Sequence, residues 1–308
     1  MKHFRSQAAR RLPSGTWLAA ALVCMATLPW QTAHAQPAPA QPVPLQAQTS
    51  SQGGWHLRAK SLAAQPDHTV LHLHVSFANQ RRPQGAQLAN SDTFLLTDHG
   101  ERLWLKRPDD DRVLQIANNA SVEKTLTFLG AIPAGTQHVT LVVNEGNAAD
   151  SVRGPSLRLP IALPPPLQAQ LKVRRVGADP ATLDASARYP VQAGNAGGLL
   201  VQVQSVHREA NHTRLAVSVA YSHRRRPEGT QLAGGETYLR TASGQRFMLQ
   251  RPPDSPTLPL ANNSTFTGDL RFQGVLPADA KGLALVINEG FPADSTRASG
   301  MVMALPAP

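Results

Sequence analysis

Apolar and polar residues alternate along most of the chain in short runs, a pattern that is typical of β-strands. Within residues 70–77, every second side chain from Leu71 to Phe77 is apolar, so these side chains share one face. Turn signals such as Asp98-His99-Gly100 separate the runs, and no stretch of ten residues has a helical period. The pattern therefore predicts an all-β fold. The other expected strands are 55–61, 93–97, 102–106, 122–129, 138–144 and 156–163.

The pattern recurs after 144 residues without a gap. Of the 109 positions in residues 53–161, 41 are identical to their counterparts in 197–305. A unit of about 110 residues is the size of an independent domain rather than of a solenoid repeat. Seven short strands in such a unit predict two tandem immunoglobulin-like antiparallel β-sandwich domains, with a small barrel as the alternative. The expected division is a signal peptide (1–35), a Pro/Gln-rich linker (36–52), β-sandwich repeat 1 (53–163), a connector with a short strand at 171–176 (164–196) and β-sandwich repeat 2 (197–308).

The N-terminus has the features of a secretory signal peptide. A basic start precedes an apolar run over residues 16–28, and Ala33-His34-Ala35 is an A-x-A cleavage site. We expect cleavage after Ala35 and a periplasmic or secreted product that begins at Gln36. The apolar run is shorter than the roughly 20 residues of a membrane-spanning helix, and no later run approaches that length. Arg10-Arg11 is a weak twin-arginine signal, because Pro13 stands where such signals have a large apolar residue.

The composition excludes several classes of protein. Cys24 is the only cysteine and lies inside the apolar run after Val23, which disfavours a lipid-attachment site. The expected mature chain has no thiol, which excludes a disulfide scaffold, a cysteine-based zinc module and a thiol enzyme. The formal charge is +10, but its spread over the mature chain is too even for a dedicated nucleic-acid surface.

No sequence motif points to catalysis. The chain has no G-x-S-x-G, no H-E-x-x-H and no phosphate-binding glycine loop. We therefore expect a non-enzymatic protein without a cofactor, and a Glu145/Asp150 acid–base pair is the remaining catalytic hypothesis. Histidines 68, 72 and 74 share a strand, and acids occupy 109–111, but neither pattern is kept in the second copy. Exposed histidines and a solvated turn are the favoured interpretations, so no metal site is predicted.

Polar loops are kept between the two copies more strictly than core positions, which vary among apolar residues. The identical segments follow the strand at 70–77, precede the strand at 122–129 and follow the strand at 138–144, three positions at one end of an immunoglobulin-like sandwich. The candidate ligand-binding residues are Arg81, Arg82, Gln87, Asn118, Asn119, Asn144, Glu145, Asp150 and Arg153, with Arg225, Arg226, Gln231, Asn262, Asn263, Asn288, Glu289, Asp294 and Arg297 in the second copy.

Two interpretations of these loops stay open. In the structural one, Arg82 or Arg153 pairs with Glu145 or Asp150 and the asparagines cap turns, so that the loops are locked without a ligand. In the binding one, the arginines make bidentate contacts to an acidic or hydroxyl-rich polymer. A recent duplication without selection on the loops is a third explanation.

The segments Phe94-Leu95…Asp98-x-Gly100-x-Arg102 and Leu141-Val142-Val143-Asn144-Glu145-Gly146 resemble secreted bacterial immunoglobulin-like modules of unknown function. This resemblance implies the fold and the compartment only. A weaker one links the chain to two-domain periplasmic pilus chaperones. The leading hypothesis is an exported, non-catalytic binding protein with two equivalent loop-end sites for an envelope polymer or an acidic ligand. The alternative is a periplasmic assembly or chaperone-like factor that docks a protein partner through its sheet edges.

Overall fold

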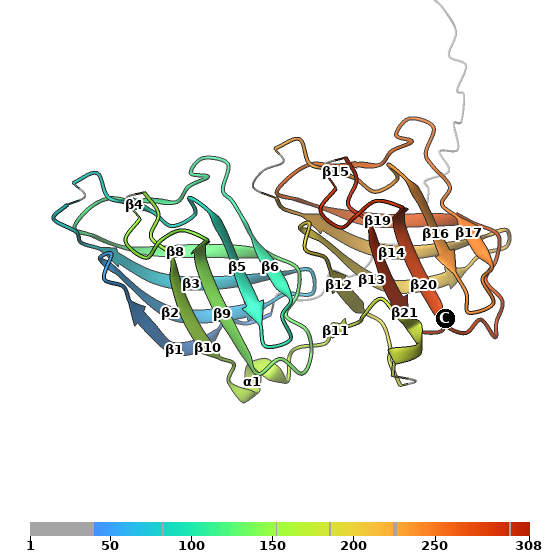
Figure 1. Ribbon diagram of the computed structural model, residues 1–308. Helices are drawn as coiled ribbons and strands as arrows, with labels where there is room; N and C mark the ends of the chain where they lie inside the picture. The colour runs from blue at the N-terminus through green and yellow to red at the C-terminus, as the bar shows by residue number, and fades with distance from the viewer. Residues whose placement is uncertain (1–39, 82, 152, 185, 224–226, 296) are drawn as a thin grey trace, which may run out of the picture. The chain divides into compact units, whose positions relative to one another are not determined.

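The computed structural model describes residues 40–308 except 82, 152, 185, 224–226 and 296, and these residues form β structure almost throughout (Figure 1). The expected signal peptide and its cleavage site lie outside the described residues. None of the helices in the described part of the chain has the length and apolar content to cross a membrane. The N-terminal half contains β1 (Val43–Ser50), β2 (Trp55–Ala64), β3 (His68–Phe77), β4 (Ala86–Gln87), β5 (Asp92–Thr97), β6 (Arg102–Lys106), β7 (Gln115–Ile116), β8 (Ala120–Leu129), β9 (His138–Glu145) and β10 (Leu157–Ala162).

The C-terminal half follows a short α1 (Pro165–Gln168). It contains β11 (Arg174–Arg175), a 3-10 turn (Pro180–Thr182), β12 (Val191–Gly194), β13 (Leu199–Arg208), β14 (His212–Tyr221), β15 (Thr230–Gln231), β16 (Glu236–Arg240), β17 (Arg246–Met248), β18 (Pro259–Leu260), β19 (Ser264–Gln273), β20 (Leu283–Glu289) and β21 (Met301–Leu305). The strands β13, β14 and β19 begin 144 residues after β2, β3 and β8.

Most strands of the N-terminal half belong to one antiparallel sheet in the order β1-β2-β3-β8-β6-β5-β9-β10. It bends into two layers because β6 pairs with β8 on one side and with β5 on the other (Figure 1). Alternation along β3 places Leu71, Leu73, Val75 and Phe77 in the interior, each fully buried. The core between the layers therefore follows directly from the period-two pattern of the sequence.

The C-terminal half has two separate larger sheets instead, and β15 pairs with β18 in a small third one. One runs β11-β12-β13-β14-β19 and the other runs β17-β16-β20-β21. The end of β17 is joined to β19 by an isolated bridge from Leu249 to Phe272 and by a hydrogen bond from the Gln250 amide to the Arg271 carbonyl at 2.7 Å. The core of this half includes the buried side chains of Val201, Val217 and Leu285.

All seven strands expected in residues 53–163 are present, and the all-β class is confirmed. The linker expected over 36–52 is wrong for its second part, since Val43–Ser50 forms β1 and pairs with β2. An edge strand tolerates proline and needs few apolar residues, so this segment has no clear alternation to find. The connector expected over 164–196 contains β11 within the short strand expected at 171–176, but its last residues form β12 and pair with β13.

Candidate functional site

Asn144 joins the polar loops of the N-terminal half that are repeated in the C-terminal half. Its side chain is completely buried, and its Oδ1 accepts a hydrogen bond from the Ser91 amide at 2.8 Å. Its Nδ2 donates to the carbonyl oxygens of Gln87 at 2.9 Å and Pro155 at 3.3 Å, and its own amide donates to Thr93 Oγ1 at 3.2 Å. The backbone φ of Asn144 is +52°, a left-handed conformation that asparagine adopts more readily than most residues. One buried amide thus ties three separate segments together.

Asn288 makes the same arrangement in the C-terminal half. Its Oδ1 accepts from the Gly235 amide at 3.0 Å, and its Nδ2 donates to the carbonyls of Gln231 at 2.7 Å and Ser299 at 3.0 Å. Its amide donates to Thr237 Oγ1 at 3.1 Å, and its φ is +53°. Both asparagine side chains are therefore buried and bonded to the backbone of neighbouring loops.

A second asparagine contacts the loop that follows β3 in one half and β14 in the other. Asn118 Oδ1 accepts from the Asn79 amide at 2.8 Å. Asn262 accepts from the His223 amide at 2.8 Å and donates to its carbonyl at 3.0 Å. The neighbouring Asn263 is left-handed at φ +61° and is bonded through its side chain to the amide and the carbonyl of Arg107, each at 2.7 Å. These contacts hold the loops in defined positions.

The glutamates are placed differently from the expectation. Glu145 lies at the end of β9 and pairs with Arg102 on β6 at 2.8 Å and Arg158 on β10 at 3.7 Å. Arg153 belongs to a loop and Arg82 lies outside the described residues, whereas Arg102 and Arg158 lie on strands of the same sheet as β9. The guanidinium of Arg102 also stacks on the Phe94 ring, 4.5 Å from its centre. Glu145 therefore belongs to a cluster on the sheet face.

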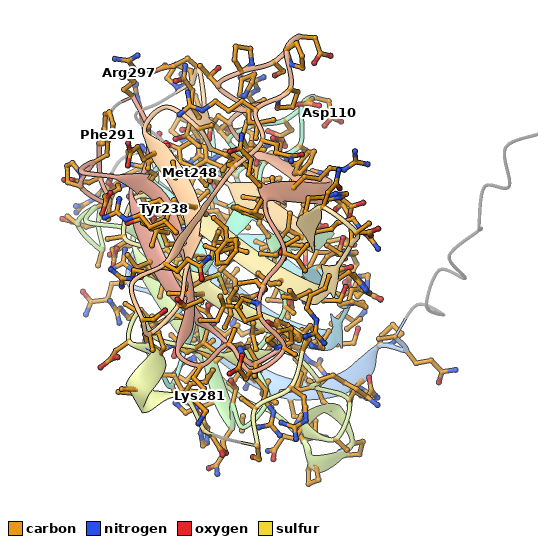
Figure 2. All side chains as sticks on the ribbon, turned by 90° about the vertical axis from the view of Figure 1, so that its right-hand side faces the viewer. Asp110, Tyr238, Met248, Lys281, Phe291 and Arg297 are labelled. Carbon is orange, nitrogen blue, oxygen red and sulfur yellow. The ribbon has the colours of Figure 1, made fainter. Side chains whose placement is uncertain are left out.

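The same cluster forms around Glu289. Arg246 contacts this carboxylate at 2.8 Å and lies 4.4 Å from the centre of the Tyr238 ring, whose hydroxyl donates to Glu289 at 2.6 Å. The Tyr238 hydrogen bond and the Arg246 contacts lower the pKa of Glu289 from its usual value. Tyr238 and Met248, labelled in Figure 2, pair across β16 and β17 beside this cluster. The sequence signal for it is an arginine kept at 102 and 246 together with an aromatic residue kept at 94 and 238.

The remaining candidate residues lie on the surface of the loops. Arg81, Arg153 and Arg297 are exposed, and so are Asp150 and Asp294. In Figure 2, Arg297 lies with Phe291 at one end of the C-terminal half, and Lys281 lies at the opposite end. Asn119 is exposed and left-handed at φ +57°, whereas Gln87 and Gln231 are half-buried. The candidates Arg82, Arg225 and Arg226 lie outside the described residues.

The loops of the N-terminal half are thus held together around exposed arginines. The Gln87 amide donates to the Arg153 carbonyl at 2.7 Å, so the third loop is anchored to the first beside Asn144. Guanidinium groups on anchored loops can bind carboxylate or phosphate groups with little loss of conformational entropy. Within the described residues, no three His, Cys, Asp or Glu side chains form a group able to hold a metal ion.

No family model, curated protein or solved structure matches the chain.

Proposed function

We propose that the chain is an exported, non-catalytic binding protein built from two tandem immunoglobulin-like β-sandwich domains related by an internal repeat. The recurrence of β2, β3 and β8 as β13, β14 and β19 at an offset of 144 residues supports the repeat. The identical roles of Asn144 and Asn288 support two equivalent sites. Each domain presents one loop-end site.

The ligand that this geometry favours is an anionic polymer of the cell envelope. The observation that carries the proposal is the buried asparagine in each half, because it holds loops on which Arg153 and Arg297 are exposed. Preformed loops lower the entropic cost of binding, and arginine forms bidentate contacts with anionic groups. Two such sites on one chain increase the avidity for a repetitive ligand.

The test is co-sedimentation of residues 36–308 with purified envelope fractions. A variant with Arg153→Ala and Arg297→Ala is compared with a control with Arg58→Ala and Arg208→Ala, which removes the same charge from exposed strand positions. We expect the loop variant to lose at least tenfold in retention and the control to stay within about twofold of the wild type. Equal retention of all three proteins, or equal losses in both variants, contradicts the proposal.

The alternative function is docking of a protein partner through a sheet edge. It is favoured by β1, which is an edge strand of the eight-stranded sheet and is mostly exposed or half-buried. An exposed edge offers unpaired backbone groups to an added strand. This function requires that the loop variant still recovers the partner from an envelope extract.

A further inference from the structure

A cavity of about 490 Å³ lies in the C-terminal half at the seam between β17 and β19. Its apolar wall includes Leu249, Leu258, Phe266 and Leu270. A smaller cavity of about 270 Å³ shares Pro252, Leu258 and Phe266 with it, so the two adjoin. The cavity lies beside the place where the two sheets are joined by the Leu249–Phe272 bridge and by the hydrogen bond from the Gln250 amide to the Arg271 carbonyl at 2.7 Å.

An ion pair covers the equivalent seam in the N-terminal half. Lys124 on β8 contacts Asp111 of the loop between β6 and β7 at 3.6 Å, and both side chains are mostly buried. Lys124 lies on the same strand face as the buried Leu126, so the pair spans the edge of the core. In addition, β6 pairs with β8 at Leu105–Phe128 and Lys106–Thr127. The C-terminal half has strand contacts at the same two positions, Leu249–Phe272 and Gln250–Arg271. The ion pair is therefore what distinguishes the two seams: it covers this seam, while the other seam is open.

The sequence of the C-terminal half removes both members of that pair. Gly268 stands at the position of Lys124 and Ser255 at that of Asp111. The Phe266 ring lies over the glycine, since a Cβ built there would be 2.8 Å from Phe266 Cζ. The consequence is visible in burial: Leu114 is 3% exposed, whereas its counterpart Leu258 is only partly buried. The open seam is thus a property of one half only.

The charges at the cavity favour an anion. Arg251 and Arg271 both line the larger cavity and both are exposed. Arg251 also donates to the Gly235 carbonyl at 2.7 Å, and Arg271 reaches the cavity from the outer face of the edge strand β19. Asp269 lines it too, but it is paired with Arg214 at 3.2 Å. The smaller cavity is lined by the exposed Asp254, which repels an anionic group and so restricts the headgroup to the arginine side.

We propose that this cavity binds a monoanionic amphiphile, an unbranched alkyl chain that ends in a carboxylate. The chain packs against Leu249, Leu258 and Phe266, and the carboxylate meets Arg251 and Arg271. A volume of this size with an apolar lining and a few convergent charges is what small-molecule sites have in common. The site is separate from the loop-end sites and occurs once per chain.

The test is calorimetric titration of the protein with dodecanoate below its micelle concentration. We expect one site per chain and at least tenfold weaker binding of dodecyltrimethylammonium, which has the same chain and the opposite charge. A variant with Gly268→Lys, Ser255→Asp and Phe266→Val carries the residues of the closed half and should lose at least tenfold in affinity. Its thermal unfolding is compared with that of the wild type to show that it folds.

A second variant keeps the test decisive if the triple variant does not fold. Arg251→Ala with Arg271→Ala alters only exposed side chains and should weaken dodecanoate binding while leaving dodecanol binding unchanged. Arg153→Ala with Arg297→Ala should bind dodecanoate as the wild type does, which separates this site from the proposed loop-end sites. Absence of dodecanoate binding, equal affinity for the cationic amphiphile, or unchanged affinity in either cavity variant overturns the proposal.

Discussion

Glu101 gives the N-terminal half a stability that depends on pH. Its side chain is buried at 6% exposure; Gln192 donates to Oε1 at 3.3 Å, and Oε2 has no hydrogen-bond partner in the described part of the chain. Burial raises the pKa of this carboxyl from 4.5 to about 7, although the hydrogen bond from Gln192 and the charge of Arg175 act in the opposite direction. The perturbation that tests this is Glu101→Gln.

The direction follows from the raised pKa. The folded state keeps the proton over a pH range in which the unfolded state has already released it, so stability falls as the pH rises from 4.5 through about 7. A change from 4.5 to about 7 corresponds to roughly 3 kcal/mol once Glu101 is fully ionised. Most of this, about 2–3 kcal/mol, is lost between pH 5 and pH 8.

The assay is urea unfolding of residues 36–308 at pH 5 and pH 8, followed by tryptophan fluorescence. Trp55 and Trp104 are the only tryptophans in this segment, so the signal reports on the half that contains Glu101. We expect the free energy of unfolding of Glu101→Gln, relative to the wild type, to rise by about 2–3 kcal/mol from pH 5 to pH 8. Comparing the two proteins at each pH cancels the carboxylates with lowered pKa, such as Asp67, whose contribution has the opposite sign. The same difference between the two proteins at both pH values would refute this reasoning.

Three further predictions concern the loops and the sheet face. Asn144→Ala should lower the free energy of unfolding by about 3 kcal/mol, because it leaves several buried backbone groups without partners. The control Asn147→Ala removes one partly buried hydrogen bond and should lower it by about 1 kcal/mol. Equal losses of the two variants in urea unfolding would contradict the role of Asn144. Gly85→Ala should lower the unfolding temperature more than Gly146→Ala does. A Cβ at Gly85 would lie 2.0 Å from a backbone oxygen, whereas one at Gly146 meets nothing within 4 Å. The reverse order would mean that the backbone around Gly85 moves to accommodate the methyl group. Arg102→Ala should cost less than about 1 kcal/mol because its ion pair is partly exposed, and a larger loss in urea unfolding would mean that its stacking on the Phe94 ring dominates.

The strands could be predicted from the sequence because the alternation of apolar and polar residues is a local property. All seven expected ranges in residues 53–163 coincide with strands, from β2 to β10. The strand β1 was missed for the complementary reason, since an edge strand such as Val43–Ser50 contacts the core with few side chains, among them Leu45. Its pairing with β2 is visible only when the partner strand is in place.

The sequence allowed only part of the candidate site to be predicted. Repetition of polar residues identified the loops, and the contacts of Gln87 with Asn144 and Arg153 bring the first and third together in the N-terminal half. Repetition did not distinguish a buried hydrogen-bonding residue from an exposed one, because both kinds are kept. Asn144 and Arg153 are both identical to their counterparts in the second copy, yet Asn144 is fully buried and Arg153 is exposed.

The all-β class, the positions of the main strands and the repeated polar loops could all be predicted from patterns along the chain. Only the tertiary structure decided which partners the polar side chains take, as with Glu145 and Arg102, which are 43 residues apart. It also decided that Lys124 and Asp111 cover one seam while Gly268 leaves the other open. The physical reason is that alternation depends on neighbours along the chain, whereas pairing, burial and cavities depend on segments that meet only after folding.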